Sequence, residues 1–175
     1  MKTSNWMKRL AVIAGSALMG LTLTIGVYAA NPEPVVAQVT FANPITMTEV
    51  NSLQWGTLDV NLNLETIIIA PNSSVSGTGT ALVIGATPAA ANVTVGASVA
   101  GITIVVGAIV PGAGYTLGTF MCNYNGESDT ACDGAGYSAT AVASATLLVG
   151  ATLTGDNSAV PGAADGSFNV TIVYQ

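Results

Sequence analysis

The side chains of this 175-residue chain that could carry chemistry are two cysteines and nine acids, beside three basic residues and no histidine. A hydrolytic triad needs histidine, and a zinc site needs more than two cysteine or histidine ligands. A Schiff base needs lysine, which occurs only at positions 2 and 8, in the segment that we expect to be removed. A carboxylate pair for glycoside hydrolysis is arithmetically available, but no spacing in the sequence supports one. We therefore expect no enzyme, with no catalytic residue, no cofactor and no metal site.

The two cysteines, Cys122 and Cys132, enclose a polar and acidic loop. In an exported chain, a pair at this spacing is typical of a disulfide. Glu127, Asp129 and Asp133 lie in or beside the loop, so a calcium site is an alternative to a solvated loop tip. The loop lacks the spacing of an EF-hand, which favours the solvated tip.

The first 29 residues are typical of a signal peptide. All three basic residues precede an uncharged apolar stretch, residues 10–25, and Val27 and Ala29 offer the small side chains that signal peptidase accepts. We expect cleavage after Ala29 and a secreted or cell-surface protein. An uncleaved anchor is the less favoured alternative, because the apolar stretch is only about as long as a minimal membrane span.

Removal of this segment would leave a chain without Lys, Arg or His, so its terminal amine would be its one cation. Binding to nucleic acid requires cations that neutralise phosphates, and binding to anionic lipid requires them too. We therefore expect neither nucleic acid nor, after processing, a membrane as a partner.

The remaining sequence predicts an all-β fold. Val, Ile and Thr dominate its apolar stretches, and Gly, Pro, Asn and Ser interrupt them at short intervals. We predict an immunoglobulin-like or pilin-like β-sandwich over residues 44–175, with a barrel as the alternative. An Ala-rich stretch, residues 137–145, has no clear pattern. Strands are expected at residues 35–42, 45–50, 65–70, 81–85, 92–97, 102–106, 115–122, 147–154 and 168–174.

The last of these strands has the clearest alternation, with Phe168, Val170, Ile172 and Tyr174 on one face. Polar residues fill most of the other face. Alternation of this kind indicates that one face packs on a core while the other meets solvent.

The segment before the sandwich, residues 30–43, contains a second alternating strand with Val35, Ala37, Val39 and Phe41 on one face. Prolines flank this strand on both sides, which separates it from the sheet that follows. It is either the ordinary first strand of its own sandwich or a donor strand that inserts into a neighbouring subunit. Spacing alone does not decide between these two interpretations.

Two features at the C-terminus favour the donor strand. The alternating last strand with penultimate Tyr174, and Gly162 thirteen residues before the last residue, resemble the C-terminal signature of chaperone–usher pilins. In that class the N-terminal extension of one subunit fills a groove in the next. The resemblance implies a second copy of this chain as partner, and a periplasmic chaperone and usher as assembly partners.

A second resemblance covers nearly the whole chain after the extension. Its motifs are Pro-Ile-Thr-Met (44–47), Leu-Gln-Trp-Gly-Thr-Leu (53–58), Asn-Val-Thr-Val-Gly (92–96), Val-Gly-Ala-Thr-Leu (149–153) and the closing residues 166–175. Together they resemble a family of secreted bacterial β-sandwich proteins that carries only a domain-of-unknown-function label and whose members look like fimbrial subunits. The chain departs from the family at Trp55, where Phe is usual, at Asn92, where an aromatic is usual, and at Ala151, where Gly is usual.

We therefore expect a structural subunit of an extracellular filament that polymerises head to tail by insertion of residues 35–42. The alternative is a monomeric secreted adhesin, or a biofilm-matrix or carbohydrate-binding module. Its candidate sugar-stacking aromatics are Trp55, Tyr115, Tyr124 and Tyr137.

Three Asn-x-Ser/Thr sequences mark candidate glycosylation sites, at Asn72, Asn92 and Asn169. We expect Asn169 to face outward, because it lies on the polar face of the last strand.

Overall fold

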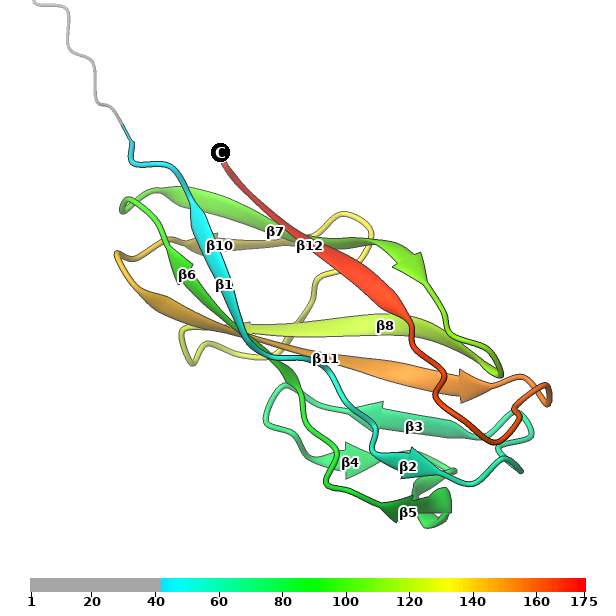
Figure 1. Cartoon of the computed structure of the whole chain (residues 1–175). Helices are drawn as coiled ribbons and strands as arrows, with labels where there is room; N and C mark the ends of the chain where they lie inside the picture. The colour runs from blue at the N-terminus through cyan, green and yellow to red at the C-terminus, as the bar shows by residue number, and fades with distance from the viewer. Residues whose placement is uncertain (1–41) are drawn as a thin grey trace, which may run out of the picture. The chain divides into compact units, whose positions relative to one another are not determined.

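A computed structural model of the chain describes residues 42–175, which lie in one compact unit. This part of the chain is all-β, as predicted, and has a single short 3-10 helix, η1 (Thr80–Leu82) (Figure 1). Its strands are β1 (Thr46–Asn51), β2 (Thr57–Leu58), β3 (Thr66–Ile69), β4 (Val75–Ser76), β5 (Val83–Gly85), β6 (Ala91–Gly96), β7 (Gly101–Val110), β8 (Tyr115–Tyr124), β9 (Thr130–Ala131), β10 (Tyr137–Thr140), β11 (Ala145–Gly155) and β12 (Ser167–Tyr174). No helix in residues 42–175 is long and apolar enough to cross a membrane.

The strands form two main antiparallel sheets. The larger sheet has the order β1-β6-β11-β3-β4, with β8 on the other side of β11 and β9 beside β8. The smaller sheet has the order β10-β7-β12, and β2 and β5 form a separate pair. Side chains of both sheets share one hydrophobic core, so the fold is a β-sandwich.

The core follows from the two-residue period of the long strands. In β7, Ile102, Ile104 and Val106 are buried while the residues between them are half-exposed. In β11, Leu147 and Val149 are buried in the same way and face the β7 residues across the core. Alternate side chains of a strand point to one face, so each of these strands contributes a continuous apolar layer.

Gly150 lies where β11 changes its neighbour. Residues 145–149 of β11 pair with β6, whereas Ala151 and the residues after it pair with β3. A Cβ atom at Gly150 would lie 2.1 Å from the carbonyl oxygen of Ile69 and 2.7 Å from the carbonyl carbon of Ala70. The close approach of the β3 backbone therefore requires glycine at this position.

The predicted strands from residue 45 onward correspond to observed strands, with one partial exception. The first part of the predicted strand 81–85 belongs to the 3-10 helix η1, and only Val83–Gly85 are extended. The prediction missed β2, β4 and β9, which have two residues each and are too short for an alternating pattern. It also missed β10, where Tyr137 is buried and pairs with Ile104 of β7. The predicted strand 35–42 lies outside the described residues apart from Ala42, which is not in a strand.

Candidate functional site

The two sheets each end in an edge strand that faces the same gap. Within residues 42–175, β1 pairs with β6 alone and β12 pairs with β7 alone. Each strand therefore has one edge whose backbone N–H and C=O groups have no strand partner. Free edges of this kind are templates for the addition of another strand. In Figure 1 the cyan strand β1 and the red strand β12 border this gap.

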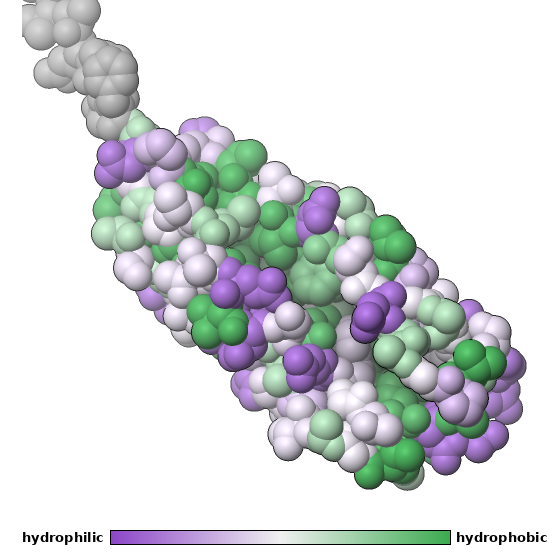
Figure 2. All heavy atoms as spheres, viewed as in Figure 1, coloured by the Kyte–Doolittle hydropathy of each residue, from purple (hydrophilic) through white to green (hydrophobic). Residues whose placement is uncertain are grey.

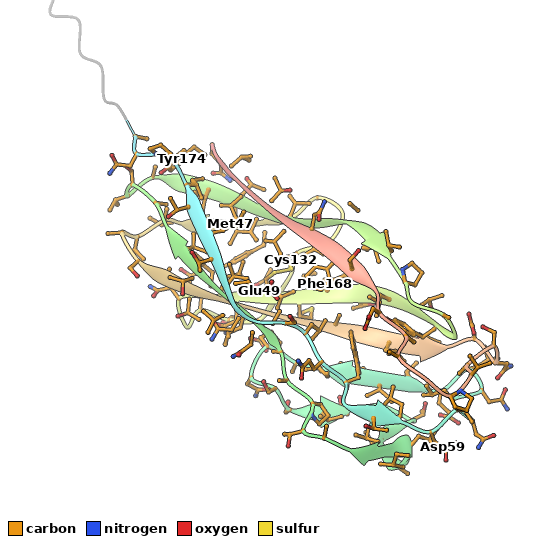
Figure 3. The ribbon with its side chains drawn as sticks, viewed as in Figure 1. Met47, Glu49, Asp59, Cys132, Phe168 and Tyr174 are labelled. Carbon is orange, nitrogen blue, oxygen red and sulfur yellow. A yellow bond between two sulfur atoms is a disulfide. The ribbon has the colours of Figure 1, made fainter. Side chains whose placement is uncertain are left out.

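A groove of about 530 Å³ lies between the two edge strands. It is lined by Met47 and Glu49 of β1, by Ala91 and Val93 of β6, and by residues 166–171 at and before the start of β12. Figure 2 shows a hollow with an apolar floor between more polar rims in this part of the surface, and Figure 3 labels Met47, Glu49 and Phe168 on its two sides.

The groove continues past the end of β1 into a second hollow of about 950 Å³. The two share Leu53 and Phe168 in their linings, and the second also involves Trp55, Tyr115 and Val160. The opening between the sheets is therefore elongated, as a segment of extended chain would require.

The inner faces of both edge strands are incompletely covered. Met47 is 45% exposed, although Val95, the residue of β6 that pairs with it, is fully buried. On β12, Ile172 is 7% exposed, whereas Val170 and Phe168 are only half-buried. Phe168 packs against the buried ring of Phe120, with ring centroids 5.0 Å apart. These side chains point toward the core from strands that lack a neighbour on the groove side.

Tyr174 ties the two edge strands together at one end of the groove. Its hydroxyl accepts a hydrogen bond from the Ser98 amide at 2.7 Å and donates one to the Asn43 carbonyl at 2.8 Å. Because the start of β1 lies near the end of β12, while Leu53 lies near Phe168, the two strands run in opposite directions. The described chain therefore begins at the Tyr174 end, and at the Phe168 end the groove leads into the second hollow.

The sequence-predicted disulfide is present, with an S–S distance of 2.08 Å between Cys122 and Cys132, both fully buried. The acids near it serve as hydrogen-bond acceptors. Asp129 accepts from the Asn123 side chain, and Asp133 accepts from the Phe120 amide. Residues 42–175 contain no cluster of three or more metal-ligating His, Cys, Asp or Glu side chains.

Glu127 from the same loop accepts a hydrogen bond from the hydroxyl of Tyr137. Burial, and secondarily this carboxylate, hold the pKa of Tyr137 well above its usual value, because both disfavour the ionised phenol. The contact fastens the acidic loop to β10.

The aromatic candidates for sugar binding are occupied within the fold. Tyr124 and Tyr137 are buried, and the indole Nε1 of Trp55 donates to the Ile67 carbonyl. Tyr115 is half-buried, and its hydroxyl donates to the Ala164 carbonyl at 2.9 Å. Burial raises the pKa of Tyr115. These four side chains do not form an exposed stacking platform.

The three sequon asparagines differ in access. Asn72 is exposed in a turn, where its side-chain oxygen accepts from the Ser74 amide, and Asn92 is half-buried in β6. Asn169 is exposed on β12 beside the groove. The predicted donor residues Val35, Ala37, Val39 and Phe41 lie outside the described residues.

Sequence reasoning missed the role of β1 as a groove wall. Met47 and Glu49 pair with Val95 and Val93 of β6, so both point to the core face of the sheet. The sequence did contain a signal for this role. Glu49 lies on the same strand face as Ile45, where an apolar residue is expected.

The fold and the groove define a class of protein, a β-sandwich whose two sheets leave one edge each of β1 and β12 unpaired within residues 42–175. The chain belongs to the family described as a domain of unknown function, DUF4402, whose model matches residues 45–174. This match agrees with the predicted domain-of-unknown-function resemblance. Searches of curated proteins and of solved structures found no match.

Proposed function

We propose that this protein is a structural subunit of an extracellular filament, and that its groove accepts the N-terminal extension of a neighbouring copy. The observation that carries the proposal is the partly apolar groove between β1 and β12, which is flanked by one free edge from each sheet. An extended strand in this position would hydrogen-bond to the free edges and cover the half-buried inner side chains.

Residues 35–42 have the composition that such a groove requires. Val35, Ala37, Val39 and Phe41 alternate with Val and polar residues, and the segment carries no charge. Eight residues in a strand span about 26 Å, the length of the eight-residue strand β12 that borders the groove. Burial of the four inward side chains is worth roughly 6–10 kcal/mol before the entropy costs of association.

The direction of the chain favours a neighbour's extension over the chain's own. The described chain begins at the Tyr174 end of the groove, so its own extension would have to reverse at Asn43-Pro44 to run back along β1. A neighbour's extension can enter from the Phe168 end and run antiparallel to β12. Repetition of this contact at every subunit gives a head-to-tail filament.

Export by the N-terminal 29 residues is part of the proposal, because a surface filament must leave the cell. The alternation in residues 30–42 and the basic, apolar leader before them support this order of segments.

Deletion of residues 30–42 tests the proposed function. Polymers closed by an inserted strand dissociate slowly, so an unheated denaturing gel of the processed protein should show a ladder that collapses to one band on boiling. The deletion variant should give only the monomer band. A normal ladder from the deletion variant would contradict the proposal.

A further inference from the structure

Glu49 occupies an unusual position in the groove wall. It pairs with Val93 across the β1–β6 ladder, and both residues line the groove on the core face of the sheet. Its carboxylate is exposed to solvent in the open groove and accepts a hydrogen bond from the Ser52 hydroxyl at 2.7 Å.

Among residues 42–175, no other ionisable side chain lines this groove. Strand β6 contributes Ala91 and Val93 to the lining. Residues 166–171, at and just before the start of β12, contribute Gly-Ser-Phe-Asn-Val-Thr. The ionisable side chains in the lining of the adjoining hollow are Asp59, Asp165 and Tyr115, and none of them carries a positive charge.

An inserted copy of residues 35–42 brings no cation to Glu49. The segment reads Val-Val-Ala-Gln-Val-Thr-Phe-Ala, and the chain holds no Lys, Arg or His after Arg9. The terminal amine left by cleavage after Ala29 precedes Val35 by five residues, about 16 Å of extended chain. An ion pair with a neighbouring subunit's side chain is therefore not available. A carboxylate that an apolar strand covers without a cation is favoured in its neutral form.

We propose that Glu49 makes strand insertion proton-coupled, so that each junction between subunits takes up a proton at Glu49 as the groove closes. The inference rests on the proposed function, and it adds a chemical condition to it. Filaments form more readily as the pH falls, and an acidic strand is rejected by the same carboxylate at neutral pH.

The direction of the effect follows from linkage. Covering a glutamate with an apolar strand makes it hold its proton to higher pH than it does in the open groove. In acid both states are protonated and the junction is at full strength. Between the two titration points the junction weakens about tenfold per pH unit, because insertion must then recover one proton from solution. Junctions are therefore roughly 10–100-fold weaker at neutral pH than in mild acid.

The test measures the concentration at which the processed full-length protein begins to polymerise, across about pH 4 to 8. The variant is Glu49→Gln, which keeps the shape and the Ser52 contact but cannot ionise. The charge-matched control is Asp129→Asn, at an exposed position in the disulfide loop that does not line the groove. High salt is a second control. It screens the repulsion between acidic subunits, but it does not lower the cost of taking a carboxylate out of water.

We expect wild type and Asp129→Asn to polymerise at roughly 10–100-fold lower concentration in mild acid than at neutral pH, in low and high salt alike. Glu49→Gln should lose most of this dependence and polymerise readily at neutral pH. An unchanged pH profile in Glu49→Gln would overturn the role of Glu49 while leaving the filament intact. Absence of polymers from every variant at every pH would instead overturn the proposed function.

Discussion

Substitution of Val170 by aspartate tests whether the groove face of β12 is the face that an inserted strand covers. Val170 points into the groove and is half-buried, whereas Val173, on the same strand, is 50% exposed and points the other way. In the open groove an aspartate at position 170 remains in contact with water, so Val170→Asp should still fold. Covering that aspartate with an apolar strand buries an unpaired charge.

The magnitude follows from the cost of desolvating a carboxylate. Burial of an unpaired charge costs several kcal/mol. A cost of about 4 kcal/mol would weaken a junction by roughly a thousandfold. Val173→Asp changes the same residue type on the exposed face, where substitutions usually cost within about 0.5 kcal/mol. The pair therefore separates loss of the groove from a general effect of added negative charge.

The assay is the ladder of multiples on an unheated denaturing gel, together with circular dichroism of the monomer. Val170→Asp should give a folded monomer and no ladder, and Val173→Asp should give the wild-type ladder. A wild-type ladder from Val170→Asp, or equal loss from both variants, would refute the placement of the inserted strand. Val170→Ala is a milder second variant, with partial loss expected, for the case that the aspartate prevents folding.

Three further predictions concern the stability of the subunit. Replacement of Cys122 and Cys132 by serine opens an 11-residue loop and should cost about 2.8 kcal/mol, a fall in Tm of roughly 10 °C by calorimetry. Tyr137→Phe removes the hydrogen bond to Glu127 and should cost about 2 kcal/mol in urea denaturation. Because the pKa of Tyr137 is raised above 10.0, the unfolded phenol ionises first, so wild type should lose stability as the pH rises above that value and Tyr137→Phe should lose less. Tyr174→Phe breaks the tie between the edge strands and should cost about 1–2 kcal/mol, with faster amide exchange at the start of β1; unchanged exchange would contradict that role.

Much of the fold is predictable because long strands carry their own signal. The alternation in β7, β11 and β12 comes from burial of one face against a core, and it can be read without knowing the partner strand. The short strands β2 and β9 form because of their neighbours in the folded chain, and two residues are too few to predict a strand from local sequence.

The groove itself could not be predicted from residue types. Its existence depends on which edges the two sheets leave unpaired, and that is a property of strand order. Phe168 and Val170 were identified as core-facing, but the sequence gives no indication that they are only half-buried. Glu49 lies inside a strand that was predicted correctly, and its importance depends on β1 being an edge.

The most direct test of the account places a photo-crosslinking amino acid at Val39 in the full-length chain. Isotopically light and heavy chains are mixed before polymerisation, irradiated, and analysed by mass spectrometry after digestion. We predict crosslinks from position 39 to β1 or to residues 167–171 of β12, with light–heavy pairs as frequent as pairs of one label. Crosslinks confined to pairs of one label would show that the segment fills its own groove, and crosslinks that avoid β1 and β12 would show that it fills neither; both results would contradict the account.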